Sequence, residues 1–245
     1  MSRFSQIRSV GVTGSTNEDM AQLLGQPQSR GLTLVADFQR RGSGRKGRAW
    51  IAPPGCALLF TTALPEPVPA DALWLVPFWS ALAVHAALAH FGVAALLQWP
   101  NDVLIDGRKA AGILCISRVT GALAWAAAGI GINVRRPAGE DELSQIDPPP
   151  AFVGDVRLVE RDDLLAQILS AMDRSCGDLS EPSRVVGSWN LAAGLPGARY
   201  RIALDGEDAP FEATAIALVD GGSLEVEHGG VTRSIALADA RILRD

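Results

Sequence analysis

Five cations lie within nine residues of this chain, and glycines separate them. The cations are Arg40, Arg41, Arg45, Lys46 and Arg48, and the glycines are Gly42, Gly44 and Gly47. Glycine lets backbone N–H groups come close to an anion, and arginine and lysine bind phosphate and carboxylate. The segment therefore indicates either a local anion-binding loop or a solvated basic turn, which is the commoner outcome for a run of charge.

The glycine spacing matches G-x-G-x-x-G by letter, but its context does not fit a dinucleotide-binding turn. That motif must open a helix, whereas residues 49–55 (AWIAPPG) cannot begin one cleanly. A P-loop is also excluded, because Gly47 precedes Arg48 and Ala49 instead of Lys-Ser/Thr. Any anion bound here must be held in another way.

Lys109 is the second residue that indicates chemistry, and it is one of only two lysines in the chain. It follows the hairpin signal Asp106-Gly107 and precedes an apolar segment, so we expect it on a buried strand. A lysine there must pair with an anion, which is either Asp102 across the hairpin or a bound phosphate or carboxylate. Gly112, within the same strand, would let a ligand approach the backbone.

Hydrophobic periodicity and turn signals predict the elements that position these residues. They are strands over 5–12 and 31–38, a helix from the N-cap Ser15 to Gly25, a buried helix within 72–91, a β meander over 101–134, a loop over 135–156 and a helix over 162–178. From about residue 200 short alternating strands follow one another, which is typical of a small β barrel or sandwich. The sequence thus predicts an α+β domain over 1–190 and a small β domain over 195–245.

Composition excludes several classes of protein. The 245 residues carry a net charge of −5 with a pI near 5.3, which argues against a nucleic-acid binder. Three cysteines without CxxC spacing and three histidines predict neither a disulfide framework nor a zinc site. The N-terminus lacks an apolar signal region, so we expect a cytoplasmic location. Residues 72–91 are long enough to span a membrane, but Pro77 interrupts them and we expect a buried helix.

Further short motifs complete a pattern along the chain. They are Ser15-Thr16-Asn17, Gln39 before the basic loop, Trp50 after it, Trp99-Pro100-Asn101-Asp102, Arg108-Lys109-x-x-Gly112 and Gly129-Ile130-Gly131-Ile132-Asn133. In this order, with a β domain that ends near Arg244, they resemble the biotin protein ligase family in its short form without an N-terminal DNA-binding domain. Two positions depart from the family pattern, because Ser43 replaces the usual Arg and Gln98 replaces the usual Lys.

The resemblance implies both a fold and a reaction. The fold would be a mixed or antiparallel sheet with packed helices, as in class II synthetase-like biotin/lipoate ligase catalytic domains, plus a C-terminal SH3-like β barrel. The family joins the carboxylate of biotin to the α-phosphate of ATP, which gives biotinyl-5′-AMP and pyrophosphate. It then transfers biotin to a lysine of a carrier domain.

The resemblance also implies site residues. The catalytic residues would be Lys109, Arg45 and Asp102, and Asp102 has two candidate roles, which are to orient Lys109 or to accept the proton of the carrier amine. Biotin would contact Ser15, Thr16, Asn17, Gln39, Gly42, Ser43, Gly44, Arg45, Lys109 and Gly112. ATP would contact Arg45, Lys46, Arg48, Trp50, Asn101, Lys109, Gly131, Asn133 and Arg244. Mg²⁺ is expected mainly through the phosphates of ATP.

The implied partners are biotin, ATP and the biotin carboxyl carrier domain of a carboxylase, with a homodimer as a further candidate. Neither nucleic acid nor a membrane is expected as a partner. A DNA-binding repressor is not expected, because the first predicted strand begins within about ten residues of Met1 and leaves no room for a helix-turn-helix. Two other functions stay open: a lipoate–protein ligase, which uses the same acyl-adenylate chemistry, and a non-catalytic module that binds biotin or a nucleotide.

Overall fold

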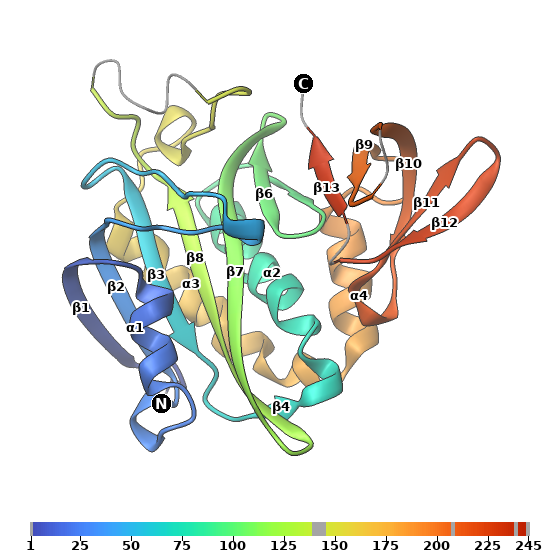
Figure 1. Ribbon diagram of the computed structural model, residues 1–245. Helices are drawn as coiled ribbons and strands as arrows, with labels where there is room; N and C mark the ends of the chain where they lie inside the picture. Colours follow the sequence, from blue (N-terminus) through green and yellow to red (C-terminus); the bar gives the residue numbers. More distant parts are fainter. Residues whose placement is uncertain (1, 139–145, 207–208, 238–239, 244–245) are drawn as a thin grey trace.

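The fold contains two sheets with helices packed between and around them (Figure 1). The computed structural model describes residues 2–138, 146–206, 209–237 and 240–243. Within these ranges the larger sheet has the strand order β1-β2-β3-β8-β7-β6-β5, and β4 pairs with β8. β1 and β2 are parallel, and the other neighbouring strands are antiparallel. The bounds are β1 Gln6–Thr13, β2 Leu32–Gln39, β3 Ala57–Ala63, β4 Val68–Pro69, β5 Leu96–Gln98, β6 Asp102–Ile105, β7 Arg108–Thr120 and β8 Leu123–Asn133.

Helices cover both faces of the larger sheet, with α1 on one face and α2 and α3 on the other (Figure 1). The helices are α1 Thr16–Leu23, α2 Leu75–His90, α3 Arg161–Ser175 and α4 Pro182–Ala192. α2 is apolar around most of its circumference because the sheet, α3 and α4 all pack against it. None of the helices in the described ranges combines the length and the apolar character needed to span a bilayer.

The C-terminal strands form a second, antiparallel sheet with the order β12-β11-β10-β9-β13. We call it the C-terminal sheet. Its strands are β9 Arg199–Leu204, β10 Phe211–Leu218, β11 Leu224–His228, β12 Val231–Ile235 and β13 Ala240–Leu243. Among the described residues the end strands β12 and β13 do not pair with each other, so the sheet is open there and the expected closed barrel is not confirmed.

The two sheets share one hydrophobic core. A continuous cluster of buried side chains joins Phe78 of α2 and Trp189 of α4 to Ile202 and Val226 of the C-terminal sheet. The rings of Phe78 and Trp189 meet edge to face, with their centroids 5.5 Å apart. Trp99 is fully buried at this junction, and its indole N–H donates a 3.0 Å hydrogen bond to the carbonyl of Gly222.

Most predicted elements are present. The strands over 5–12 and 31–38, the buried helix, the hairpin at Asp106-Gly107 and the helix over 162–178 are all confirmed, with ends that differ by a few residues. Ser15 occupies the N-cap position of α1, but its side chain makes no capping hydrogen bond there, so that part of the prediction was wrong. β3, β4, β5, α4 and β13 were not predicted.

Replacing Trp99 with phenylalanine tests the junction between the sheets. Trp99→Phe leaves the buried carbonyl of Gly222 without its donor, so we expect the free energy of unfolding to fall by about 1–3 kcal/mol. Urea denaturation of the wild type and the variant measures the change. Trp74→Phe, at a half-buried tryptophan of the same region, is the control with the smaller expected loss. Equal losses in the two variants would contradict the role given to this hydrogen bond.

Candidate active site

A flat patch of backbone on β7 and β8 forms the floor of the candidate site. Gly112 and Gly131 face each other across the two strands, and the indole of Trp50 lies on both. A Cβ at Gly131 would lie 2.6 Å from Trp50 Cε2, and a Cβ at Gly112 would lie 3.1 Å from Trp50 Cζ3. Any side chain at Gly131 would therefore displace the indole. Gly112 was predicted to admit a ligand, and the structure shows that Trp50 and the end of Lys109 occupy the space above it.

The next glycine on the same face of β8 supports a group of neutral polar side chains. A Cβ at Gly129 would lie 2.2 Å from Asn17 Oδ1, so Asn17 rests directly on the strand. Its amide donates a 3.0 Å hydrogen bond to the carbonyl of Leu114. The hydroxyl of Thr61 lies 2.8 Å from Asn17 Oδ1 and 2.8 Å from the hydroxyl of Thr16. This end of the site therefore presents hydrogen-bonding groups without charge.

Gln39 completes the neutral end of the site. Its side-chain Oε1 accepts a 2.7 Å hydrogen bond from the backbone N–H of Thr16 and lies 3.0 Å from the Thr16 hydroxyl. The first turn of α1 and the end of β2 are thereby joined. Thr61, which lies fully buried on β3, was not predicted, because a threonine within an apolar strand carries no signal that indicates a site.

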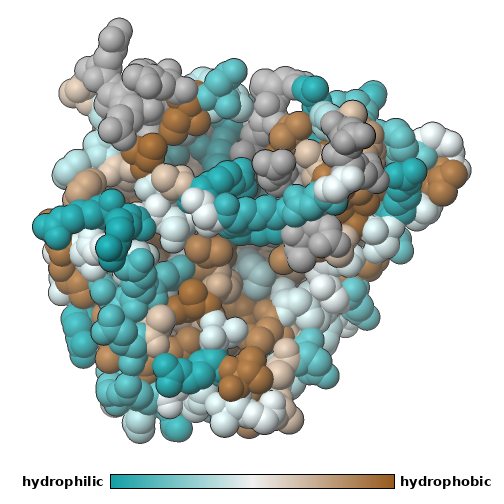
Figure 2. Space-filling model, in the orientation of Figure 1, coloured by the Kyte–Doolittle hydropathy of each residue, from teal (hydrophilic) through white to brown (hydrophobic). Residues whose placement is uncertain are grey.

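Residues 42–50, which we call the ligand loop, cross in front of the sheet as a narrow hairpin. The backbone N–H of Trp50 donates to the carbonyl of Gly42 over 2.8 Å, and the N–H of Gly44 donates to the carbonyl of Arg48 over 2.7 Å. Figure 2 shows a hydrophilic band across the molecule where Figure 1 draws this loop, and the surface is hollowed above and below the band. The loop therefore bridges a hollow instead of lying on a solid surface.

A cavity of about 280 Å³ lies between the ligand loop and the floor. Its lining includes fourteen of the predicted site residues, namely Ser15, Thr16, Asn17, Gln39, Ser43, Gly44, Arg45, Arg48, Trp50, Asn101, Lys109, Gly112, Gly131 and Asn133. The lining also includes residues that the sequence analysis did not name as site residues, namely Ala49, Ile51, Phe60, Ile113, Leu114, Gly129, Ile130, Ile146, Asp147, Pro148 and Pro150. Residues far apart in the sequence are thus gathered around one space.

Four predicted residues are not among the described lining of the cavity. Gly42 lies at the base of the ligand loop, where a Cβ would lie 2.5 Å from the carbonyl oxygen of Trp50. Asp102 lies behind Lys109, and Lys46 points toward the C-terminal sheet. Arg244 lies outside the described residues. Gly42 and Asp102 have structural contacts that position residues of the lining.

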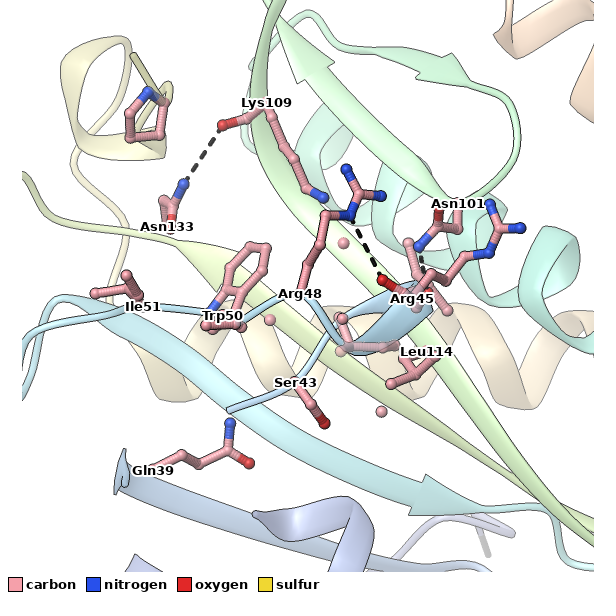
Figure 3. A pocket seen from close by; sticks show the side chains of 18 of the residues that line it. Gln39, Ser43, Arg45, Arg48, Trp50, Ile51, Asn101, Lys109, Leu114 and Asn133 are labelled. Atoms are coloured by element: carbon pink, nitrogen blue, oxygen red, sulfur yellow. Dashed lines mark hydrogen bonds between the residues drawn. The ribbon is translucent and has the colours of Figure 1, made fainter. Parts of the chain in front are cut away.

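Cationic groups meet at the other end of the cavity. Figure 3 shows the side chains of Lys109 and Arg48 reaching toward each other over the cavity, while Arg45 extends toward Asn101. The ammonium of Lys109 lies 2.7 Å from a carboxylate oxygen of Asp102 and 5.5 Å from the centroid of the Trp50 ring. Asp102 is buried, so the predicted pair across the hairpin exists and fixes the direction of Lys109.

Arg45 has a more enclosed environment than its neighbours in the loop. Its guanidinium donates a hydrogen bond to the carbonyl of Leu237, near the C-terminal sheet. Burial lowers the pKa of Arg45, and the nearby charge of Arg48 lowers it further, whereas Asp102 and Asp205 act in the opposite direction. An arginine remains charged at neutral pH despite such a shift. Burial therefore leaves a cation with reduced hydration, which binds an anion more strongly.

Asn133 connects the floor to the segment that closes the cavity. Its amide group donates to the carbonyl of Lys109 over 3.4 Å and to that of Ala151 over 3.2 Å. The N–H of Ala151 also donates to the Lys109 carbonyl over 2.9 Å. These bonds hold residues 146–150 against one side of the cavity. The prolines of this segment predicted a loop, and the resemblance implied that residues 135–153 fold over the adenine of ATP. The structure places most of residues 146–150 in the lining of the cavity, and their contact with an adenine stays a prediction.

The geometry can hold a ligand with a neutral polar head and an anionic remainder. The indole N–H of Trp50 is buried, and no described residue accepts its hydrogen, so a ligand acceptor there would remove the cost of an unsatisfied donor. No group of three or more histidine, cysteine, aspartate or glutamate side chains gathers within the described ranges in a way that would bind a metal ion. The cationic side chains in the lining of the cavity are those of Arg45, Arg48 and Lys109.

Comparisons with known proteins agree with this geometry. A profile of the biotin/lipoate A/B protein ligase family matches residues 10–133. The chain is 31% identical to the biotin–[acetyl-CoA-carboxylase] ligase of Mycobacterium tuberculosis, over 99% of this chain and 91% of that protein. It is 38% identical to the ligase of the same name from Paracoccus denitrificans, over 58% of this chain and 60% of that protein.

Solved structures show the same fold. The biotin protein ligase from Aquifex aeolicus in complex with biotin and ATP superposes with a TM-score of 0.78, at 21% identity, over 99% of this chain and 100% of that chain. The biotin protein ligase from Leishmania major in complex with biotinyl-5-AMP gives a TM-score of 0.63 at 21% identity, over 95% of this chain and 99% of that one. Because the family profile matches half of the chain and the Mycobacterium tuberculosis ligase aligns with 99% of it, this chain belongs to the biotin/lipoate A/B protein ligase family.

Proposed function

We propose that this chain is an ATP-dependent biotin protein ligase. It would form biotinyl-5′-AMP and pyrophosphate from biotin and ATP, and then transfer biotin to a lysine of a biotin carboxyl carrier domain. The observation that carries the proposal is the division of one cavity into a neutral polar end and a cationic end. The neutral end suits the uncharged ureido ring of biotin, and the cationic end suits its carboxylate and the phosphates of ATP.

The first step brings two anions together. At an effective dielectric of 20, two unit charges about 4 Å apart repel by about 4 kcal/mol. Lys109 and Arg45, with Arg48 beside them, would offset this repulsion while an oxygen of the biotin carboxylate attacks the α-phosphorus. A C–O–P link forms, the bond to pyrophosphate breaks, and no base is needed because the acid is already ionised. Mg²⁺ would bind through the phosphates of ATP.

The second step consumes the mixed anhydride. The carrier amine attacks the carboxyl carbon, so a C–N bond forms, the bond to the phosphate oxygen breaks, AMP leaves and the amine loses a proton. The contact of 2.7 Å between Asp102 and Lys109 supports a role for Asp102 in orienting Lys109. Acceptance of the proton from the carrier amine stays the second candidate role of Asp102, which is not among the described lining residues of the cavity.

Asn133 and Arg48 belong to the nucleotide side of the proposed site. The bonds of Asn133 to Lys109 and Ala151 support its part in holding residues 146–150 near the adenine. Arg244 remains a proposed ATP contact. We further propose two domains, over residues 1–190 and 195–245, of which the second would be an SH3-like barrel. The proposed location is the cytoplasm. The proposed partner is the carrier domain of a carboxylase, and a homodimer is a candidate assembly.

Lipoate ligation is the second candidate function, because the matched family includes both activities. The protein is incubated with ATP, Mg²⁺ and either biotin or lipoate, and the acyl-AMP is detected by mass spectrometry. We expect biotinyl-5′-AMP, followed by biotin on the carrier lysine when a carrier domain is added. Lipoyl-AMP alone would assign the other activity. Binding of biotin or ATP without any acyl-AMP would indicate a non-catalytic module.

Replacing Lys109 tests the cationic end. Lys109→Met should lower the rate of acyl-adenylate formation by about 10²–10³-fold, because one preorganised charge is lost at the transition state. Arg118→Met, at an exposed cation further along β7, is the control and should retain the wild-type rate. Thermal unfolding of both variants reports whether the fold is kept. Adenylation by Lys109→Met at the wild-type rate would reduce Lys109 to a structural partner of Asp102.

Adding one methyl group tests the floor. In Gly131→Ala the new Cβ would lie 2.6 Å from the Trp50 ring, so we expect the indole to move and adenylate formation to fall about tenfold, in line with typical overpacking costs. Gly187→Ala is the control, because no atom lies within 4 Å of its added Cβ and alanine favours helix α4. Rates are measured at saturating biotin over a range of ATP. An unchanged KM for ATP and an unchanged rate would show that the position of Trp50 is unimportant.

Ser43 offers a gain of function. It lies at the exposed edge of the cavity, at the position where the family pattern described above has an arginine. Ser43→Arg adds a cation, and a charged hydrogen bond is worth about 1.5–3 kcal/mol, so we expect biotin to bind about tenfold more tightly and less adenylate to escape. Calorimetry measures the affinity, with Gln28→Arg as a control of equal charge. The same biotin affinity in both variants would refute the role of the loop in binding biotin.

A further inference from the structure

Two adjacent cations of the ligand loop contact the C-terminal part of the chain. The ammonium of Lys46 lies 2.5 Å from a carboxylate oxygen of Asp205, a residue 159 positions away. Asp205 follows β9 directly, in the turn at the end of that strand. Beside it, the guanidinium of Arg45 donates a hydrogen bond to the carbonyl of Leu237. The loop is therefore attached at its tip to the second sheet.

The side chain of Lys46 points away from the cavity, although neighbouring residues of the ligand loop line the cavity. Arg45 and Arg48 are lining residues, and Lys46 is not among those described. Its backbone is left-handed, with φ 54° and ψ 34°, a conformation that is unfavourable for residues other than glycine. Such a conformation persists where surrounding contacts hold it. The described contact that fixes the end of this side chain is the ion pair with Asp205.

We infer that Lys46 and Asp205 are a positioning pair that attaches the ligand loop to the C-terminal sheet, so that Lys46 does not bind the phosphates of ATP. The consequence of this pair for catalysis rests on the proposed function, whereas the contact itself does not. A loop attached at its tip keeps Arg45, Arg48 and Trp50 over the cavity. The C-terminal sheet then contributes to nucleotide binding without touching the nucleotide at this position.

The pair is partly exposed, which sets the size of the effect. The side chains of Lys46 and Asp205 are 28% and 55% exposed, and exposed ion pairs contribute modestly and weaken as salt rises. Loss of the carboxylate should therefore increase the population of the detached loop about threefold at low salt. At about 0.5 M salt we expect most of this difference to disappear.

Limited digestion with trypsin tests the contact without any substrate. Trypsin cleaves after a lysine that can enter its pocket, and cleavage of a transiently opened segment follows the population of the open form. Asp205→Ser removes the carboxylate, keeps every trypsin site and avoids an Asn-Gly sequence before Gly206. Asp220→Ser, at an exposed turn between β10 and β11, is the matched control. Mass spectrometry follows the peptide that ends at Lys46.

We expect cleavage after Lys46 to be about threefold faster in Asp205→Ser at low salt and unchanged in Asp220→Ser. In 0.5 M salt the wild type should approach the rate of Asp205→Ser. Equal rates for the wild type and Asp205→Ser at low salt would overturn the inference, and so would a difference that persists undiminished at high salt.

Kinetics then separate a positioning pair from a phosphate ligand. If the two side chains act as a pair, Lys46→Met and Asp205→Ser each raise the KM for ATP by a similar factor of about three, and the double variant is no worse than either. The exchanged variant Lys46→Glu with Asp205→Lys should recover part of the loss.

A phosphate ligand at Lys46 predicts the opposite pattern. Asp205→Ser would then lower the KM for ATP by releasing Lys46, whereas Lys46→Met would raise it. That result would overturn the inference. Failure of the wild-type protein to form biotinyl-5′-AMP would instead refute the proposed function, and the digestion result would still decide the contact.

Discussion

Gly112 and Gly131 form a surface without Cβ atoms across β7 and β8. This surface determines where the walls of the cavity lie. The indole of Trp50 can rest on this surface only because neither residue carries a side chain. Trp50 in turn closes the ligand loop through its hydrogen bond to Gly42. Gly129, two residues before Gly131, supports Asn17 in the same way. One face of one strand pair thus positions both the aromatic wall and the neutral polar end.

Electrostatics explain how an acidic chain can hold anionic substrates. The net charge is −5, yet Arg45, Arg48 and Lys109 meet at one end of a small cavity. Asp102 fixes Lys109 from behind, so the buried carboxylate directs a cation into the cavity without occupying it. The ligand loop spans from the larger sheet to the C-terminal sheet, and the two sheets share one hydrophobic core.

The sequence predicted the elements whose signals are local. Fourteen of the residues that line the cavity were predicted through the motifs that resemble the family. Turn chemistry at Asp106-Gly107 and helical spacing over residues 162–178 are examples of such local signals. What it could not provide are relations between distant segments. The space above Gly112 is filled by Trp50, and the contact of Lys46 with Asp205 depends on a sheet whose placement no local pattern encodes.

In the proposed reaction, the residues around this cavity join the carboxylate of biotin to the α-phosphate of ATP. Isotope exchange between labelled pyrophosphate and ATP tests that step alone, because it needs no carrier and reports the reversal of adenylate formation. We expect label to enter ATP when biotin is present and not to enter it when biotin is omitted. Exchange that proceeds equally without biotin, or that only lipoate supports, would contradict it.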